Sequence, residues 1–597
     1  MADYETHQFD VVVVGAGGAG LRAAIEASAR GMKTALVCKS LLGKAHTVMA
    51  EGGIAAALGN VYPEDNWRVH FRDTMRGGKF LNNWRMAQIH AEEAPQRVLE
   101  LEEWGALFDR TADGRILQRD FGGHRYARLA HVGDRTGLEM IRTLQHHAVH
   151  KGIDVFMECT ITRLLKDGDR IAGAFGYWRE SGRLVVFQSP AVVLATGGIG
   201  KAYKITSNSW EYTGDGHALA LWAGADLIDM EFVQFHPTGM VSPPSVRGIL
   251  VTEGVRGDGG VLKNALGERF MFNYIPEMFR AETADTEEEA DRWYTDKQGA
   301  RRTPDLLPRD EVARAINAEV KAGRGSPHGG VFLDIATRRD PDYIRRRLPS
   351  MYHQFLELAD VDITNEAMEV GPTCHYMMGG VRVDAETQAS TVPGLFAAGE
   401  VAGGMHGANR LGGNSLSDLL VFGRRAGLYA SEYVRAVSSS PTVNIGEVET
   451  RAQEALRVFE ETGTENPYAI QQDLQDCMQT LVGIIRTEDE LVKALDELAV
   501  LSERAERVRV VGHRQYNPGW HLALDLAPLL TVSESITRAA IERKESRGAQ
   551  TRDDYPKTDP ELGTVNVVVR QVDGNMALAV EPLPPIPDDL RHLLENS

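Results

Sequence analysis

VVVVGAGGAG at residues 11–20 decides the fold of this chain. Its four consecutive valines are typical of a buried strand in a parallel sheet. The strand runs straight into Gly15-x-Gly17-x-x-Gly20, the spacing with which a tight turn opens a helix and directs backbone N–H groups at a pyrophosphate. A second strand-like run, TALVC at 34–38, follows a helical stretch. We therefore predict an α/β protein that begins with half of a Rossmann-like dinucleotide-binding domain.

The next segment, KAHTVMAEGG at 44–53, places a lone histidine, His46, among small residues just past the second strand. From there its ring could reach the far end of a bound dinucleotide. An NAD-binding domain usually ends its second strand with an acid for the ribose, whereas this strand ends in Cys38-Lys39-Ser40. These features favour a flavin over a free nicotinamide cofactor. They also favour a flavin that is attached to the protein.

Composition narrows the class further. With 65 Lys and Arg against 84 Asp and Glu, the net charge is −19, which argues against nucleic acid and anionic lipid as direct partners. No run reaches the ~18 apolar residues needed to span a bilayer, and the polar N-terminus MADYETHQFD is unlike a secretory signal. The four cysteines are scattered without a CxxC motif, so no iron–sulfur or other metal site is predicted. We expect an intracellular chain whose membrane and metal-cluster functions reside on other subunits.

The 597 residues are too many for one core. Buried-strand patterns recur at AVVLATGG (191–198) and VPGLFAAGE (392–400), and TGDG supplies Asp215 as an acceptor for a ribityl hydroxyl. The highly charged stretch 277–308 predicts a surface excursion. We expect an α+β capping domain inserted into an FAD-binding domain, then a helical bundle and a small C-terminal domain. The expected bounds are 1–240 and 365–435 for the FAD-binding domain, 241–364 for the capping domain, 436–555 for the helical domain and 556–597 for the C-terminal domain.

Reactive side chains gather among glycines in five short segments: QFHPTG (234–239), TEGVRGDGG (252–260), LPRDE (307–311), CHYMMGG (374–380) and HGANRLGGN (406–414). Each segment alone is more often a turn or the start of a surface helix, but coincidence does not readily explain five of them in one dinucleotide-binding chain. A small dicarboxylate has two anionic ends, which suit planar arginine forks and the directional hydrogen bonds of histidine and threonine. The candidate active-site residues are His236, Thr252, Glu253, Arg256, Arg309, His375 and Arg410.

Between about Phe9 and Pro556 the chain carries an ordered series of motifs: GAGGAG, HTVMAEGG, RDFGGH, TGDG, EFVQFHPTG, TEGVRGDGG, PRD, PTCHYMMGG, GLFAAGE, HGANRLGGNSL and RKESRGAQTRDDY. In these motifs and their order it resembles the flavoprotein subunit of succinate dehydrogenase and fumarate reductase, the respiratory complex II family. The resemblance implies oxidation of succinate to fumarate by hydride transfer to FAD, coupled to proton loss from the neighbouring carbon.

The resemblance also implies a role for each matching cofactor position. His46 resembles the histidine that is bonded to the 8α-methyl group of FAD, a link that raises the flavin potential for a weak reductant such as succinate. The other positions expected to hold FAD are Gly15, Gly17, Gly18, Gly20, Lys39, Ser40, Thr47, Glu51, Gly52, Gly53, Asp215, Glu400, Ser415 and Leu416.

The substrate roles follow from the same resemblance. Arg309 matches the arginine that exchanges the substrate proton, and Glu253 and Arg256 look like its relay to solvent. Phe121, in RDFGGH, resembles an aromatic side chain that lies against the substrate. The positions that match the carboxylate-binding groups are His236, Thr252, His375 and Arg410.

Three departures from the family pattern bear on function. Lys44-Ala45 replaces the Arg-Ser that commonly precedes the tethered histidine. Glu51 stands where many succinate oxidisers have glutamine, and a carboxylate near the flavin ring would shift the balance toward fumarate reduction. Gln550 replaces a common histidine near the end of the matched region.

The resemblance further implies partners, because electrons must leave a flavin one at a time and this chain lacks cluster ligands. They are an iron–sulfur subunit and a membrane anchor with quinone, which would hold the chain peripherally on the cytoplasmic face of the cell membrane. The nearest alternatives are a fumarate reductase working in reverse and an L-aspartate oxidase with noncovalent FAD, whose members lack a histidine at position 46. A flavin-fold module without substrate turnover is a third alternative, against which the presence of Arg309, His375 and Arg410 argues.

Overall fold

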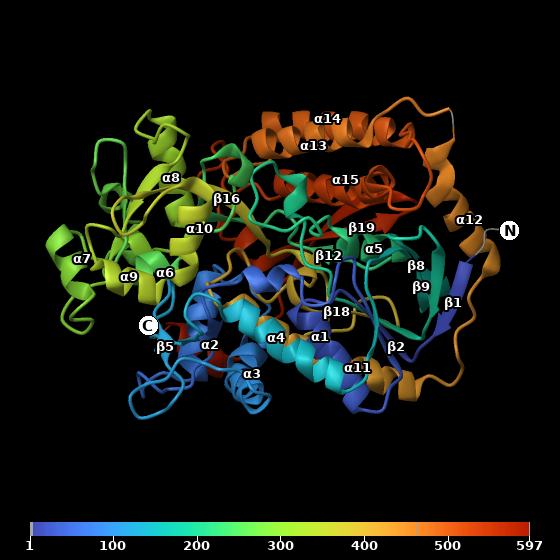
Figure 1. Cartoon of the computed structure of the whole chain (residues 1–597), viewed down its shortest axis with the longest axis horizontal. Coiled ribbons are helices and arrows are strands. Elements are labelled where there is room, and N and C mark those ends of the chain that lie inside the picture. The colour runs from blue at the N-terminus through green and yellow to red at the C-terminus, as the bar shows by residue number, and fades with distance from the viewer. Residues whose placement is uncertain (1–3, 461, 596–597) are drawn as a thin grey trace.

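The computed structural model describes residues 4–460 and 462–595 (Figure 1). The first three residues of the polar N-terminus, residue 461 of the expected helical domain and the last two residues of the expected C-terminal domain lie outside the described residues. Across the described ranges, no helix is both long and apolar enough to cross a bilayer. Figure 1 places helices α7, α8 and α9 at one end of the molecule and the N-terminal strand β1 at the other.

A five-stranded parallel sheet with the order β18-β11-β2-β3-β7 forms the centre of the dinucleotide-binding region. The four valines of β2 are fully or almost fully buried and pair in register with β3 on one side and β11 on the other. This confirms the predicted strand–turn–helix, because helix α1 (Gly18–Ala29) follows β2 directly. The strands are β2 (Val11–Val14), β3 (Thr34–Val37), β7 (Asp154–Phe156), β11 (Ala191–Leu194) and β18 (Leu395–Ala397).

The glycines of the turn are required by close backbone contacts. Gly15 has a φ of +112°, and a Cβ atom there would lie 2.1 Å from the carbonyl oxygen of Ala195 on the neighbouring strand segment. A Cβ atom on Gly20 would lie 1.7 Å from the carbonyl oxygen of Gly15. Only glycine allows the helix to approach the end of the strand this closely.

Helix α11 (Asn414–Ala436) packs against α1 over much of its length. Gly423 and Gly427 meet the backbone of Ala19 and Ala23, where added Cβ atoms would lie 2.6 and 2.3 Å from carbonyl oxygens. This close packing brings the first part of α11 next to the turn after β2, where a Cβ atom on Gly18 would lie 2.8 Å from Leu419 Cδ1. The other helices of this region are α2 (Trp67–Gly77), α3 (Trp84–Glu103), α4 (Thr136–His150) and α5 (Asp215–Ala223).

Two further sheets complete this part of the molecule. One is four-stranded, with the order β1-β10-β9-β8, and the other is three-stranded, with the order β4-β6-β5. The strands are β1 (Tyr4–Gln8), β8 (Cys159–Asp167), β9 (Arg170–Trp178), β10 (Leu184–Gln188), β4 (Ile54–Ala55), β5 (Gln118–Arg119) and β6 (Leu129–Ala130).

A second hydrophobic core lies between residues 240 and 370 and is separate from the main core. Its sheet has the order β13-β16-β15-β14, and the two long strands β13 and β16 lead into and out of it. The elements are β13 (Val233–Met240), β14 (Val261–Lys263), β15 (Val331–Asp334), β16 (Met368–Met377), α6 (Gly254–Gly257), α7 (Glu287–Trp293), α8 (Arg309–Lys321), α9 (Pro341–Arg347) and α10 (Pro349–Ala359).

The stretch 277–308 is only partly the surface excursion that its charge predicts. Its last residues are buried because Asp305 accepts a hydrogen bond from the backbone of Leu262 at 2.8 Å and the carbonyl oxygen of Asp305 accepts one from Arg256. Tyr294 also donates a hydrogen bond to the carbonyl oxygen of Arg256, at 2.8 Å. The end of this stretch therefore packs around Arg256 rather than facing solvent.

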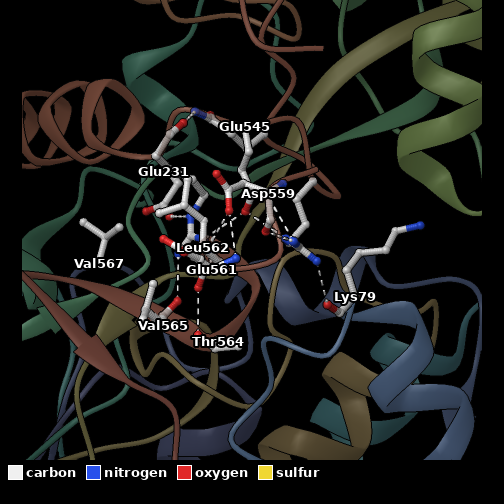
Figure 2. Close-up of polar contacts among 12 residues, drawn as sticks. Lys79, Glu231, Glu545, Asp559, Glu561, Leu562, Thr564, Val565 and Val567 are labelled. Atoms are coloured by element: carbon white, nitrogen blue, oxygen red, sulfur yellow. Dashed lines mark hydrogen bonds and ion pairs between the residues drawn. The ribbon is translucent and has the colours of Figure 1, made fainter. Parts of the chain in front are cut away.

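The C-terminal part adds a layer of helices and a hairpin. Strands β19 and β20 extend a sheet with the order β17-β12-β19-β20, so the hairpin pairs with a strand from the first half of the chain. At this junction Arg543 donates to Glu231, to the Leu562 carbonyl at 2.8 Å and to the Val565 carbonyl at 3.1 Å. Figure 2 shows the polar network there, with Glu231, Leu562 and Val565 labelled. The elements are α12 (Ile445–Leu456), α13 (Pro467–Leu481), α14 (Glu488–Glu506), α15 (Pro518–Glu542), α16 (Asp588–Glu595), β12 (Leu227–Ile228), β17 (Gly380–Val381), β19 (Val565–Val572) and β20 (Asn575–Pro582).

Candidate active site

One cavity runs past the turn after β2 and the glycine-rich segment before α11. Nearly every residue expected to bind cofactor or substrate lines it, Phe121 included. Gly20 and Arg256 do not: Gly20 packs on Gly15 within the turn, and Arg256 lies buried behind Glu253. The expected residues that line the cavity are Gly15, Gly17, Gly18, Lys39, Ser40, His46, Thr47, Glu51, Gly52, Gly53, Phe121, Asp215, His236, Thr252, Glu253, Arg309, His375, Glu400, Arg410, Ser415 and Leu416.

Lys39 occupies the end of β3, at one end of the cavity. Its Nζ donates to Thr213 at 2.8 Å, to Asp215 at 3.0 Å and to Asp525 at 2.7 Å. Burial opposes the charge on Lys39, but Asp215 and Asp525 outweigh it and raise its pKa. Because the end of this strand is where a dinucleotide fold holds the adenosine ribose, the position of Asp215 favours that ribose over the ribityl chain predicted for it. Sequence reasoning missed Asp525, which comes from α15.

The cavity offers what a dinucleotide requires. Helix α1 begins with Gly18 at the cavity wall, so the partial positive charge of its first turn faces the space where a pyrophosphate would lie. Thr47 Oγ1 accepts a hydrogen bond from the Gly18 N–H at 3.3 Å. Three buried oxygens on the wall, Thr196 Oγ1, Glu51 Oε2 and Glu211 Oε2, have no hydrogen-bond partner among the described residues. Groups of this kind are normally satisfied by a partner, so the donor and acceptor set fits a bound FAD.

His46 begins a short 3₁₀ helix, His46–Met49, whose residues line the cavity in part. Its Nδ1 accepts a hydrogen bond from the backbone N–H of Ser209 at 3.3 Å, and its Nε2 lies 3.2 Å from Asn208 Nδ2. The ring meets Tyr212 edge-on, with centroids 4.8 Å apart. Burial, together with nearby Lys201, lowers the pKa of His46 to about 4. The imidazole is therefore neutral and holds its Nδ1 lone pair toward Ser209.

Two carboxyl groups on the cavity wall are shifted toward the neutral acid. Burial raises the pKa of Glu51 well above its ordinary value, and the carboxyl group of Asp134 adds to the effect. Burial likewise raises the pKa of Glu400 to about 7, although Glu400 accepts a hydrogen bond from the Met377 N–H at 2.9 Å. The expectation that Glu51 is a carboxylate beside the flavin is therefore not supported, since its surroundings favour the uncharged form.

Arg309, the first residue of α8, lies at the other end of the cavity. Its Nε donates to Glu253 Oε2 at 3.0 Å, and Glu253 Oε1 accepts from the Gly122 N–H at 2.6 Å. Arg256 Nη2 lies 3.9 Å from the same Glu253 oxygen. Burial opposes ionisation of Glu253, but the charges of Arg309 and Arg256 outweigh it and lower its pKa. The three side chains form a buried row that ends at Arg309.

Arg410 is held by three neighbours. Its Nη1 donates to Ser415 Oγ at 2.9 Å, its Nη2 donates to Gln234 Oε1 at 3.1 Å, and its guanidinium lies over the ring of Tyr376. The same Gln234 oxygen accepts from Arg309 Nη1 at 3.5 Å. Burial and the charge of Arg309 lower the pKa of Arg410 to about 9. Two guanidinium groups therefore share one neutral acceptor and both line the cavity.

Gln234 is a residue that the sequence reasoning passed over. It stands in the segment QFHPTG, from which only His236 was selected. The signal that could have found it is strand alternation: residues 234 and 236 of β13 lie on one face of the strand.

The remaining expected substrate groups surround the two arginines. The rings of His236 and His375 meet edge-on with centroids 5.0 Å apart. Burial lowers the pKa of both histidines. The charge of Arg309 lowers the pKa of His236 further, and His236 lowers the pKa of His375 further. Both rings are therefore neutral hydrogen-bonding groups. Phe121 is wedged between backbone segments, because a Cβ atom on Gly52 or Gly412 would lie within 2.5 Å of its ring.

Gln550 and the residues around it lie away from the cavity. Gln550 is fully buried, accepts a hydrogen bond from Arg486 and donates to the Ala540 carbonyl at 2.9 Å. Arg552 donates to the same carbonyl oxygen at 2.9 Å. This segment therefore joins the C-terminal helices rather than contributing to the candidate site.

Comparisons with known proteins agree with this geometry. The family described as FAD binding domain matches residues 10–416, and the family described as fumarate reductase flavoprotein C-term matches residues 471–584. The cavity and these matches define the class: the protein is an FAD-binding oxidoreductase.

Individual relatives narrow the class. One relative, from the fumarate reductase (CoM/CoB) of Methanothermobacter marburgensis, is 44% identical over 559 residues, covering 93% of this chain and 96% of its own length. The succinate dehydrogenase flavoprotein subunit of Coxiella burnetii is 39% identical over 581 residues, covering 94% of each. The solved Mycobacterium smegmatis Sdh1 in complex with UQ1 is 61% identical, with a TM-score of 0.85 over 97% of this chain and 95% of that one. The chain belongs to the family of succinate dehydrogenase and fumarate reductase flavoprotein subunits.

Proposed function

We propose that this protein oxidises succinate to fumarate, using FAD bonded to His46, and passes the electrons to an iron–sulfur subunit and quinone. One observation carries the proposal: Arg309 and Arg410 face the same cavity that begins at the dinucleotide turn, with neutral His236 and His375 beside them. A four-carbon dicarboxylate matches this set, because Arg410 and the neutral hydrogen-bonding groups around it suit the two carboxylates, beside the pair of Arg309 with Glu253.

Arg410 and its neighbours bind and orient the substrate. The guanidinium of Arg410 supplies a planar fork for one carboxylate, and the neutral imidazoles of His236 and His375 supply hydrogen bonds for the rest of the molecule. The buried walls exclude water, so each charge–charge contact acts in a medium of low dielectric constant. In the proposed domain division, the capping region (residues 241–364) contributes Arg309 and Thr252 to the wall of the cavity.

Arg309 takes the proton that succinate loses. An arginine normally stays protonated, so this role needs a route by which its own proton can leave. Glu253 provides it: its carboxylate accepts from Arg309 Nε at 3.0 Å and faces Arg256 on its other side. The bound FAD supplies the acceptor for the hydride that leaves the neighbouring carbon.

His46 is proposed as the residue that holds the flavin covalently through Nε2. The support is the surroundings of the ring: the Ser209 N–H points at Nδ1, so a bond from Nε2 to the flavin would leave on Nδ1 the lone pair that this N–H needs. Its low pKa keeps the ring neutral, as a nucleophile must be. The Lys44-Ala45 departure lies outside these contacts.

Denaturing gels test the covalent link. The wild-type protein, expressed with any assembly factor it needs, is expected to give a band that fluoresces under ultraviolet light. His46→Ala is expected to give a dark band, whereas the exposed control His513→Ala is expected to fluoresce like the wild type. A dark wild-type band would favour noncovalent FAD.

Turnover tests the reaction itself. The purified protein with FAD is mixed with succinate and an artificial electron acceptor dye, and bleaching of the dye is expected. Arg410→Met is expected to abolish bleaching, since it removes one carboxylate-binding fork while keeping a side chain of similar length. A wild-type protein that leaves the dye unchanged would overturn the proposal.

The direction of the reaction is proposed as oxidation. Glu51 was the feature that favoured fumarate reduction, and its raised pKa weakens that argument. Rates of succinate oxidation and fumarate reduction, measured in one preparation of the native assembly, decide between the two. Faster fumarate reduction would favour the alternative, a fumarate reductase.

The partners proposed are an iron–sulfur subunit and a membrane anchor with quinone, with this chain peripheral on the cytoplasmic face of the cell membrane. Family membership supports them, as does the relative whose structure holds UQ1. Purification of the native assembly is expected to yield these subunits together with this chain. Isolation of this chain alone under mild conditions would contradict the proposal.

A further inference from the structure

Three buried histidines lie behind the glycine-rich segment that carries Arg410. Each directs Nε2 at the stretch 412–417: His124 at the Gly412 carbonyl at 2.7 Å, His70 at Asn414 Oδ1 at 2.9 Å, and His90 at Ser417 Oγ at 2.8 Å. They come from different parts of the fold, since His70 is on α2, His90 is on α3 and His124 follows β5. All three side chains are fully buried, and none lines the cavity.

The neighbouring contacts identify which ring nitrogen carries the proton on two of these histidines. Arg128 Nη1 lies 3.4 Å from His124 Nδ1 and can only donate, so His124 donates from Nε2. The Asn414 amide nitrogen donates to Thr74 Oγ1 at 3.0 Å, which leaves Asn414 Oδ1 to accept from His70. His70 is thus a donor at Nε2, and its Nδ1 has no partner among the described residues.

His90 follows the same pattern. The Ser417 hydroxyl donates within its own helix, to the carbonyls of Gly413 and Asn414, so its oxygen accepts from His90 Nε2. His90 Nδ1 likewise has no partner in the described ranges. Burial lowers the pKa of His90 to about 3, so the group donates without carrying a charge.

The three histidines hydrogen-bond to residues on both sides of Ser415, which in turn holds Arg410. Ser415, which accepts from Arg410 Nη1 at 2.9 Å, lies between the anchored residues 414 and 417. A shift of this stretch would move Ser415 and change the direction of the Arg410 guanidinium. Neutral donors suit the location, because a charged anchor would add to the positive charges of Arg410 and Arg128.

We propose that His70, His90 and His124 are positioning residues: they fix the segment 412–417 and thereby set the direction of Arg410 for binding a dicarboxylate. The part that concerns the dicarboxylate rests on the proposed function. The part that concerns the segment rests on the three hydrogen bonds alone, so the two are tested separately.

Hydrogen exchange tests the segment without any substrate. In the FAD-loaded protein, His90→Phe keeps a ring but removes the donor, and it is expected to speed amide exchange in peptides that cover 406–417. His90→Gln keeps a donor near the position of Nε2 and is expected to exchange like the wild type. Ser417→Ala removes the acceptor instead, and should reproduce the effect of His90→Phe without adding to it in the double variant.

Malonate binding, followed by its difference spectrum on the bound flavin, tests the link to Arg410. His90→Phe and Ser417→Ala are each expected to raise the Kd for malonate about tenfold, the size of one lost hydrogen bond, with His90→Gln close to wild type. His217→Phe, a buried histidine of α5 far from the segment in sequence, controls for general loss of stability.

The outcomes separate the two proposals. Exchange in 406–417 that is the same in wild type, His90→Phe and Ser417→Ala overturns the positioning role. Faster exchange with unchanged malonate affinity overturns the link to Arg410. The third outcome is a wild-type protein that neither binds malonate nor oxidises succinate, while the exchange pattern is as expected. This result overturns the proposed function and leaves the segment anchored as described.

Discussion

Glu253 accepts a hydrogen bond from Arg309 Nε at 3.0 Å, and both side chains are almost wholly withdrawn from solvent. The pair links two elements of the region that holds the second hydrophobic core, because Glu253 precedes α6 and Arg309 begins α8. Removing one partner of such a pair leaves a buried, unmatched charge. Substitutions here are therefore expected to have large effects on turnover.

Arg309→Lys keeps the positive charge but loses the Nε contact with Glu253. We expect succinate oxidation to fall by about 10²- to 10⁴-fold, the range typical of a lost general acid or base, while malonate still binds. Steady-state kinetics and malonate titration measure the two effects. Arg314→Lys, which alters a partly exposed ion pair further along α8, is the matched control and should retain most activity. Equal losses in both variants would contradict a role for Arg309 in proton transfer.

Glu253→Gln is expected to change the stability of the protein in a pH-dependent way. The pKa of Glu253 is lowered in the folded state, so its ionised form contributes stability above its ordinary value of 4.5, and this contribution is lost as the pH falls through the lowered pKa. The wild type should therefore unfold at a higher temperature than Glu253→Gln near neutral pH, and the gap should narrow in acid. Thermal unfolding at a series of pH values checks this; a gap that does not vary with pH would argue against it.

Gln234 is expected to act through the two arginines that share its oxygen. Gln234→Met removes the acceptor and should raise the KM for succinate about tenfold, with a smaller change in kcat. Gln234→Glu places a negative charge between Arg309 and Arg410, and should weaken dicarboxylate binding further because the charge competes with the substrate. If Gln234→Glu binds malonate better than Gln234→Met, a negative charge at position 234 does not compete with the substrate, and this explanation is wrong.

Glu51→Gln is expected to leave the flavin potential nearly unchanged at neutral pH. Burial and Asp134 favour the neutral acid of Glu51, which is close in charge and shape to glutamine. At alkaline pH the wild-type group ionises and disfavours the reduced flavin, so its potential should fall below that of the variant. Reductive titrations at several pH values measure the difference. A large gap at neutral pH that does not grow in alkali would show that Glu51 is already ionised.

Local signals in the sequence predicted the parts of the fold that depend on neighbours along the chain. The valines of β2 and the glycines after them define a strand and a turn whose geometry follows from their own backbone. The cavity-lining residues His46, Arg309 and Arg410 were also found, because each stands in a short segment of reactive and small residues.

Long-range partners could not be predicted in this way. Asp525 reaches Lys39 from 486 positions away, and nothing in its own helix marks it as a cavity partner. The surroundings that favour the neutral acid of Glu51 could not be predicted for a similar reason, since they are its burial and Asp134 rather than its sequence neighbours. Such interactions become visible only after packing brings distant side chains together.

The contact between Lys39 and Asp525 also bears on the order of events during synthesis. A ribosome delivers Lys39 and its first acidic partner, Asp215, early, but the second acid that balances the buried charge, Asp525, arrives only after most of the polypeptide has been made. The nucleotide end of the chamber therefore reaches its final electrostatic state late in biogenesis. Nascent chains stalled before residue 525 should therefore capture the cofactor less well than the full-length chain does.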